Sequence, residues 1–282
     1  MPNEADKKVE KPLKLGTAQY AYILNYTMDY TLKELKELGF RYIELMTAPP
    51  HIWPPAFDQN QRKALRNQIE NLGLELVAIN PTYLDLNMAS PNPGMREESV
   101  RQIIDQITLA HDLGAKLIVV IIGKRHPLIA YPVEVVWEKF AEEGVLRCVE
   151  HAEKMNVIFG LENGPSLFID TVDRMRFVLD RVRSSHMKVV FDVANASVVE
   201  PIVPAFDKIK EDLVHVHLSD TDMRTWTHSG IGEGKIDFIS IAAKLREIDY
   251  QGISILETTM PNEPRVSIID SVEKLTRLGW YI

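Results

Sequence analysis

The chain has 282 residues, a formal net charge of −8 at pH 7 and a single cysteine, Cys148. The acidic balance argues against a nucleic-acid partner, which requires a basic surface to offset the phosphates. One cysteine excludes an internal disulfide framework and a cysteine-based zinc cluster. Its helical position between apolar residues favours a buried thiol over a nucleophile.

The first twelve residues, MPNEADKKVEKP, are polar and charged, and no later stretch is apolar enough for a membrane span. We therefore expect residues 1–12 to be a disordered lead-in. We expect residues 13–282 to form one domain of a cytoplasmic protein that does not bind membranes.

From residue 13 onward, short apolar runs rich in β-branched residues alternate with amphipathic stretches of helical spacing, such as 95–113 and 133–155. The strand candidates are LKLGTAQY, RYIELM, LELVAIN, KLIVVIIG, VIFGLEN, MKVVFDVAN, LVHVHLSD and GISILETT. Several helical stretches end in a glycine suited to a C-terminal cap: Gly39, Gly73 and Gly114. Eight strands alternating with eight helices predict an α/β fold, a single-domain (β/α)₈ TIM barrel. An open sheet would want a glycine-rich phosphate loop after its first strand, and GTAQYAY is not one.

Four consecutive predicted strands, the fifth to the eighth, end in side chains that can bind a metal: Glu162, Asp192, His217 and Glu257. Parallel barrel strands point their C-termini to the same rim, so these groups are expected to converge there. Several carboxylates in one place repel one another unless a cation holds them together. Three carboxylates and one imidazole favour Mn²⁺, with Mg²⁺, Co²⁺ or Zn²⁺ as alternatives. The sequence therefore predicts one divalent metal ion and no organic cofactor.

Two further residues of the seventh strand region are open to several interpretations. His215 lies two positions before His217 and faces the same side of the strand. We expect it to be a core histidine or a residue that orients His217. Asp220 is expected to orient His217, to contact substrate or to cap the turn.

The longer loops that follow the strands, 47–58, 82–94, 123–132 and 221–237, are expected to open on the same rim. The substrate contacts predicted from strand ends and loops are Glu44, His51, Trp53, Asp220, Arg224 and His228. A single basic residue on such a loop is equally explained as a solvated surface group. Trp53 and Trp226 are expected either to form an aromatic wall against a sugar or to anchor their own loops.

At these strand ends the chain resembles the sugar isomerase/epimerase superfamily of xylose-isomerase-like barrels. Within it the chain is most similar to ketose 3-epimerases, such as fructoselysine 3-epimerase and tagatose 3-epimerase. The resemblance covers about residues 13–280 and rests on PNPGMREESV, LEN, FDVAN, HVHLSDTD…THSGIGEGKIDF and ILETTMPNEPR. It implies that Glu162, Asp192, His217 and Glu257 hold the metal. It also implies that Glu162 and Glu257 exchange protons with the substrate carbon.

The chain departs from the tagatose-type pattern at two positions. Those enzymes have a substrate-contacting histidine three residues after the metal-binding aspartate, where this chain has Asn195. Asparagine can donate a hydrogen bond to a sugar oxygen but cannot titrate. We therefore expect Asn195 to line the substrate pocket without binding the metal. Their arginine after the metal histidine has only an offset counterpart, Arg224.

The expected activity is that of a metal-dependent sugar epimerase or isomerase. It would transfer a proton at the carbon next to the carbonyl of a ketose or keto-sugar derivative, through an enediolate, with 3-epimerisation favoured. We also expect a homo-oligomer, a dimer or a tetramer. The alternatives are a metal-dependent dehydratase of a keto-inositol or keto-sugar acid and a non-catalytic sugar-binding protein. A metal-dependent nuclease would require more histidine ligands and a basic rim.

Overall fold

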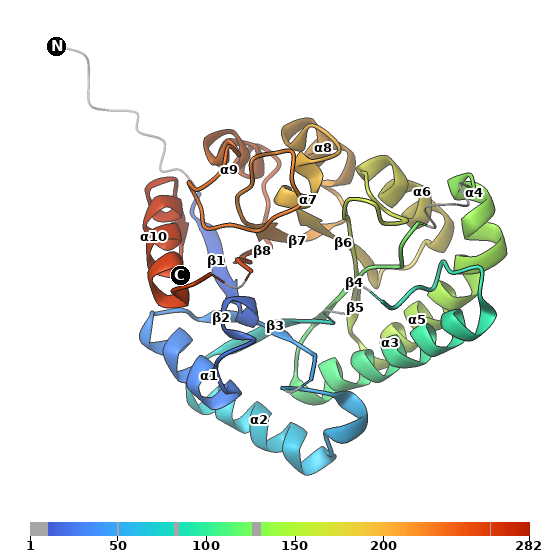
Figure 1. Cartoon of the computed structure of the whole chain (residues 1–282), viewed down its shortest axis with the longest axis horizontal. Helices are drawn as coiled ribbons and strands as arrows, with labels where there is room; N and C mark the ends of the chain where they lie inside the picture. The colour runs from blue at the N-terminus through green and yellow to red at the C-terminus, as the bar shows by residue number, and fades with distance from the viewer. Residues whose placement is uncertain (1–10, 50, 82–84, 126–130, 260) are drawn as a thin grey trace.

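The structure is a computed structural model and describes residues 11–49, 51–81, 85–125, 131–259 and 261–282. Its parallel strands form the predicted closed barrel, in which β2 to β8 pair in chain order and β1 pairs with both β8 and β2 (Figure 1). The strands are β1 (Leu13–Ala18), β2 (Tyr42–Met46), β3 (Glu75–Asn80), β4 (Leu117–Val120), β5 (Ile158–Glu162), β6 (Met187–Asp192), β7 (Leu213–Leu218) and β8 (Ile253–Leu256). A short ninth strand, β9 (Trp280–Tyr281), pairs with the start of β1.

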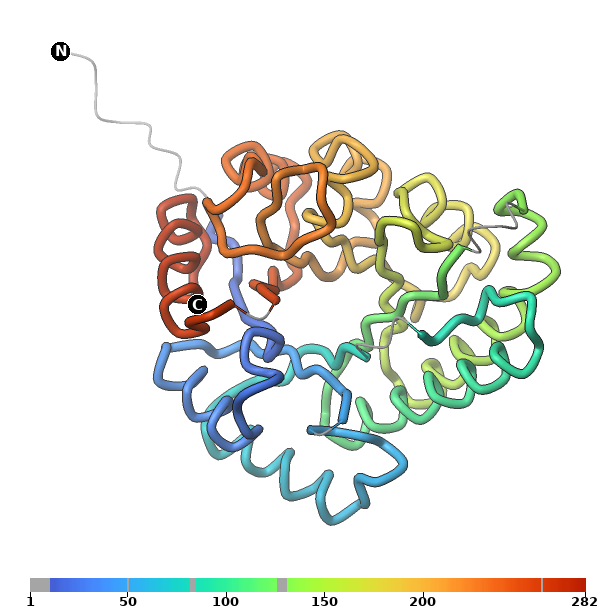
Figure 2. The backbone as a smooth tube through the Cα atoms, in the orientation of Figure 1, coloured from blue at the N-terminus to red at the C-terminus, as the bar shows by residue number. Residues whose placement is uncertain are grey.

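The helices form a ring outside the strands, and the chain runs once around the barrel, so that the C-terminal helix lies beside β1 (Figure 2). They are α1 (Met28–Glu37), α2 (Gln59–Asn71), α3 (Pro93–Leu113), α4 (Val133–Val136), α5 (Glu142–Met155), α6 (Val172–Val182), α7 (Val193–Ser197), α8 (Ile202–Ile209), α9 (Phe238–Glu247) and α10 (Pro264–Arg277). The predicted glycine caps follow α1, α2 and α3 with φ angles of 91°, 68° and 84° at Gly39, Gly73 and Gly114. A residue with a side chain is strained at these left-handed angles, whereas glycine adopts them easily.

Two layers of apolar side chains hold the barrel, because alternate residues of a strand face opposite sides. On β4, Ile118 and Val120 pack outward in the main core against the helices. Leu117 and Val119 face the barrel interior, where they pack with Ala78 and Val190. The inward positions nearer the C-terminal ends of the strands carry polar residues instead, which places them at the rim where the βα loops begin.

The structure departs from the expected elements in two places. The predicted helix 133–155 is interrupted by a π-helical turn, η3 (Trp137–Ala141), between α4 and α5. This wide turn begins at Trp137, whose side chain is 1% exposed and donates a hydrogen bond from Nε1 to Glu142. The connection from β6 to β7 contains two short helices, α7 and α8, and α7 begins directly after Asp192, whose side chain caps it.

Some predictions fall partly on residues that the structure does not describe. Residues 1–10 of the predicted lead-in lie outside the described residues, as do 82–84 and 126–130 of two predicted rim loops. The carbonyl oxygen of Lys11 already accepts a hydrogen bond from Arg246. Within the described ranges, no helix is both long enough and apolar enough to cross a membrane.

Candidate metal centre and active site

The four predicted metal ligands come together at the C-terminal rim of the barrel. Glu162 and Asp192 are the last residues of β5 and β6, His217 lies one residue before the end of β7, and Glu257 directly follows β8. One donor atom from each of the four lies within 4.8 Å of the other three. All four side chains are buried. The geometry is that of a ligand set, while the binding of an ion by these residues stays a prediction.

His217 lies at the centre of this cluster, with a carboxylate at each ring nitrogen. Its Nδ1 is 2.8 Å from Glu162 Oε1, 3.3 Å from Glu257 Oε2 and 3.8 Å from Asp192 Oδ2. Its Nε2 is 3.2 Å from Glu44 Oε2. With acceptors on both sides, the ring can hold a proton on each nitrogen. A metal ligand must present a lone pair, so ion binding at Nδ1 would replace the proton there.

The pKa shifts of the cluster express an excess of buried negative charge. Burial raises the pKa of the Glu257 carboxyl well above its usual range, and neighbouring carboxylates raise it further. Burial also raises the pKa of Glu162. For His217, burial acts to lower the pKa, but the charges of Glu257 and Glu44 and the bond to Glu162 outweigh burial and raise it well above normal. Such a site takes up positive charge, either as protons or as a cation.

The donor set fits a divalent cation. Asp192 Oδ2 is buried and has no hydrogen-bond partner among the described residues, although a buried carboxylate oxygen is costly to leave unpaired. Donors on opposite sides of one ion, at the roughly 2.1 Å bond length of Mg²⁺, lie about 4.2 Å apart. The four donor atoms lie within 4.8 Å of one another, close enough for one ion to contact all of them.

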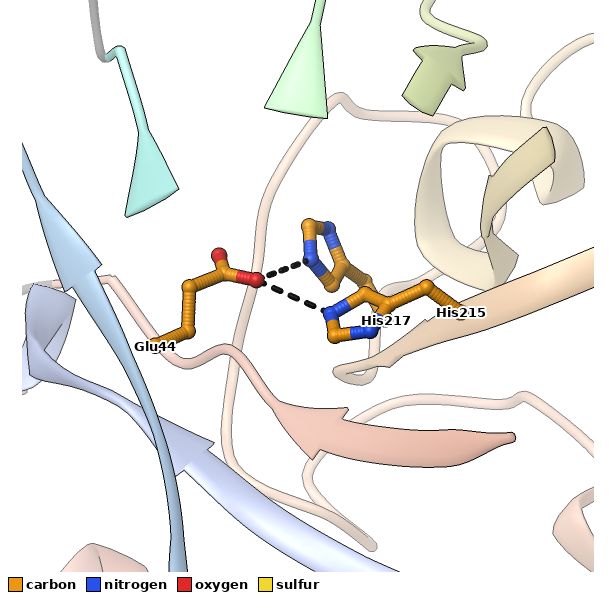
Figure 3. Close-up of side chains that lie close together, drawn as sticks. All are labelled: Glu44, His215 and His217. Carbon is orange, nitrogen blue, oxygen red and sulfur yellow. Dashed lines mark hydrogen bonds and ion pairs between the residues drawn. The ribbon is translucent and has the colours of Figure 1, made fainter. Parts of the chain in front are cut away.

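Glu44, predicted as a substrate contact, points toward the imidazole rings of His215 and His217 (Figure 3). Its Oε2 accepts hydrogen bonds from Nε2 of His215 at 2.9 Å and Nε2 of His217 at 3.2 Å. Its Oε1 accepts from Asn80 Nδ2 at 3.0 Å, and the side chain is completely buried. β2 continues to Met46, so Glu44 lies deeper in the barrel than a residue at the strand end, and its contact with substrate stays a prediction.

This arrangement makes Glu44 and His215 orienting partners of His217. The side-chain donors of Glu44, His215 and His217 also lie close enough to hold an ion, but hydrogen bonds account for their contacts. Burial acts to raise the pKa of Glu44, but the charge of His217 and the hydrogen bonds from both imidazoles outweigh burial and lower the pKa. A carboxylate that accepts the far N–H of a ligating histidine sets which nitrogen faces the metal. Of the two interpretations of His215, the geometry favours the one in which it helps to orient His217.

A cavity of about 300 Å³ opens above the cluster. Its polar lining includes Glu162, Glu257, Asn195 and His228, all of them predicted site residues. Its apolar lining consists of Tyr20, Met46, Pro81, Ile121 and Trp226. Of the two tryptophans considered for an aromatic wall, Trp226 is the one that lines this cavity.

Asp220 holds the loop between β7 and α9. The side chain is 1% exposed, and its two oxygens accept hydrogen bonds from the backbone N–H groups of Thr221, Gly232 and Ile236. Asp220 and Ser229 also form an antiparallel bridge. This geometry supports the turn-capping alternative for Asp220, which is not among the described residues that line the cavity.

The remaining predicted contacts do not line the cavity. His51 and Trp53 are half-buried, and His51 Nε2 lies 2.5 Å from the carbonyl oxygen of Ile23, which ties the loop after β2 to the loop after β1. Arg224 is exposed on the loop after β7. Loop side chains such as these have no periodic pattern that predicts their direction.

Two asparagines of the site were not singled out from the sequence. Asn80, the last residue of β3, donates to Glu257 Oε1 at 3.2 Å as well as to Glu44. Asn163 exchanges side-chain hydrogen bonds with the backbone N–H and C=O of Asp192. Both follow the same rule as the predicted ligands, a polar side chain at a strand end, but an uncharged amide draws less attention there.

The fold and site define a (β/α)₈ barrel with a buried cluster of carboxylates and histidine beneath a rim cavity. The model of the xylose isomerase-like TIM barrel family matches residues 32–278, and the chain belongs to this family. This confirms the family that the strand-end motifs indicated.

Several sugar epimerases are similar to the chain along almost its whole length. Fructoselysine 3-epimerase from Shigella flexneri is 26% identical over 259 residues, which cover 89% of this chain and 93% of that protein. The crystal structure of a D-tagatose 3-epimerase-like protein has a TM-score of 0.83 at 24% identity, over 94% of this chain and 97% of that one. The structure of the IolI protein with a zinc atom has a TM-score of 0.81 at 16% identity, over 94% and 98% of the two chains. The two structures show a shared fold.

Proposed function

We propose that the protein is a divalent-metal-dependent sugar epimerase that transfers a proton at the carbon next to the carbonyl of a ketose, with 3-epimerisation as its reaction. The observation that carries the proposal is the buried cluster of Glu162, Asp192, His217 and Glu257, two of whose carboxylates also line the cavity. The kinship with fructoselysine 3-epimerase supports the choice of reaction.

The four clustered residues would hold one divalent ion, for which Mn²⁺ is our choice among Mn²⁺, Mg²⁺, Co²⁺ and Zn²⁺. Three carboxylates and one imidazole form a mainly oxygen donor set, which suits these harder ions. When bound, the ion supplies Lewis acidity, which polarises a carbonyl oxygen and makes the neighbouring C–H more acidic. A proton transfer of this kind requires no organic cofactor.

Glu162 and Glu257 are the proposed proton-transfer pair. They come from β5 and β8, three strands apart around the barrel, so they approach the cavity from different directions. A carboxylate on one side of a substrate carbon can accept its proton while a carboxyl group on the other side donates one. Asn80 holds Glu257 through its Oε1. Inversion of a carbon requires this arrangement, one group on each face.

The substrate we propose is an uncharged sugar rather than a sugar phosphate. The charged groups among the described residues that line the cavity are carboxylates, with no lysine or arginine. Residues 82–84, 126–130 and 260, which fall outside the described ranges, contain no lysine or arginine either. A phosphate would therefore find no lysine or arginine among these residues to pair with.

The test is incubation of the metal-loaded protein with free ketoses in D₂O, followed by NMR. We expect deuterium at the carbon next to the carbonyl and formation of the epimer. Glu162→Gln and Glu257→Gln, with metal content measured in parallel, should each keep the ion and lose about 10²–10⁴-fold in turnover. Epimerisation without deuterium uptake, or near-normal turnover in a metal-loaded Gln variant, contradicts the two-carboxylate mechanism. Loss of a hydroxyl from the substrate would show a dehydratase, and binding without exchange a sugar-binding protein.

A further inference from the structure

Trp226 lies in the cavity wall, on a segment of the loop between β7 and α9 that several hydrogen bonds hold together. The base of this segment is the bridge between Asp220 and Ser229. Within it, Asp222 Oδ1 accepts two backbone N–H groups, and Thr221 Oγ1 donates to the carbonyl of Thr225 at 2.7 Å. The backbone up to Trp226 is therefore held in place, while the indole itself is 38% exposed.

The indole is held by one residue of a different loop. Its Nε1–H donates to Asn195 Oδ1 at 2.5 Å. Asn195 is 4% exposed, and its Nδ2 donates to the carbonyl oxygen of Asn163 at 2.9 Å. This second bond fixes which end of the amide faces the indole, because the nitrogen is already directed at a carbonyl.

We propose that Asn195 is a positioning residue that locks Trp226 as the fixed wall of the substrate cavity, and so acts on substrate specificity through the indole. The side chain of Asn195 does this at the position where its backbone N–H donates to Asp192 Oδ1 at 2.6 Å. One residue thus connects a predicted metal ligand with the wall that faces it.

The chemistry of the two groups explains why the bond matters. An indole offers a broad apolar face to the C–H groups of a sugar ring or chain, and its N–H is its one polar group. A partly exposed ring without a partner for that N–H would sample several rotamers, and substrate would have to order it on binding. The Asn195 bond removes this cost before substrate arrives. The proposed sugar substrate rests on the proposed function, but the lock itself does not.

The first test observes the lock without any substrate. In ¹⁵N-labelled protein the indole N–H resonance of Trp226 is assigned by its disappearance in Trp226→Phe. We expect Asn195→Ala to shift this resonance upfield and to speed its exchange with solvent, as loss of a hydrogen bond does. Asn71→Ala, on the exposed end of α2, is the matched control and should leave the resonance unchanged. An unchanged Trp226 resonance in Asn195→Ala overturns the proposal, whatever the protein does to sugars.

The second test measures steady-state kinetics on the ketose that the D₂O experiment identifies. Trp226→Phe retains an aromatic ring and loses only the N–H donor and the second ring. We expect Trp226→Phe and Asn195→Ala each to raise KM by about 2- to 10-fold, the range of an ordinary hydrogen bond, with a smaller change in kcat. The double variant should be no worse than the more impaired single variant, because both remove the same bond. Multiplying effects, or losses confined to kcat, would show that Asn195 acts on the reacting atoms instead.

Discussion

Replacing Glu44 by glutamine should weaken metal binding although Glu44 is not a predicted ligand. Its Oε2 accepts from two imidazole N–H groups and its Oε1 from the amide of Asn80. A glutamine has one acceptor oxygen and one donor NH₂, so one of these buried donors must face another donor. Each such loss costs about 1–3 kcal/mol in a buried site.

The sign of the effect on metal binding follows from charge. Glu44 stabilises positive charge at His217, whether it is a proton or a metal ion on Nδ1. A divalent ion carries twice the charge of the proton that it replaces. The loss of Glu44 therefore weakens the binding of the ion more than the binding of the proton. We expect an affinity about 10- to 100-fold lower, the range for residues that orient a ligating histidine, which corresponds to about 1.4–2.7 kcal/mol.

The assay is calorimetric titration of the apoprotein with Mn²⁺ in competition with a chelator of known affinity. Glu34→Gln is the matched control, since Glu34 is also a buried glutamate but pairs with Arg265 outside the cluster. It should bind Mn²⁺ as the wild type does. If Glu44→Gln folds normally by circular dichroism and binds Mn²⁺ within about twofold of the wild type, the orienting role of Glu44 is wrong.

Further expected outcomes concern the metal, the thiol and the two loops. Removing the metal with a chelator should lower the midpoint of thermal unfolding by about 5–10 °C. The reference is protein with free metal ion at 100 times the Kd of the ion, where binding contributes about 2.7 kcal/mol. An unchanged midpoint would argue against a metal site in the folded state. Burial raises the pKa of Cys148 to about 12, so a thiol reagent at pH 8 should label it only after unfolding. The stability that this protonated thiol contributes is complete below the ordinary thiol pKa and declines as the pH rises above it toward about 12, which denaturant titrations at pH 8 and 10 can compare. Asp220→Asn should lower the free energy of unfolding by about 1–3 kcal/mol, measured in urea, because at least one loop amide loses its acceptor; a change below about 0.5 kcal/mol contradicts the turn-capping role. His51→Ala should raise KM or lower kcat while the bound metal is retained, since the substitution frees the loop that His51 ties to Ile23. Unchanged kinetics would favour the interpretation of His51 as a surface residue without a role at the site.

The sequence predicted the parts of the molecule that follow a periodic pattern. Strand and helix periods differ, so their alternation identified the barrel, and the helix ends at Gly39, Gly73 and Gly114 followed from the conformational freedom of glycine. The clustering of Glu162 with His217 also followed from topology alone, because parallel strands in a barrel end at one rim.

What the sequence could not predict depends on depth and on irregular backbone. Glu44 lies two residues before the end of its strand, and the inward face of a barrel takes residues at several depths. Asp220 turned out to hold its own loop, because the amides that it binds come from residues up to 16 positions later, along a path without periodicity. The same applies to Trp226, whose place in the cavity depends on a contact with Asn195 from another loop.

The last strand has a consequence for how the chain reaches its fold. β9 adds its two residues beside the start of β1, where Leu13 pairs with Trp280, and the buried indole of Trp280 donates to Ser254 on β8. β1 therefore receives these neighbours only after β8 and β9 have been made, much later in synthesis. Contacts between such distant residues form slowly, and until then one edge of β1 is an unpaired strand open to other chains. We expect the nascent barrel that lacks β8 and β9 to be the state most prone to aggregation, and loss of β9 to impair folding more than it impairs the distant rim.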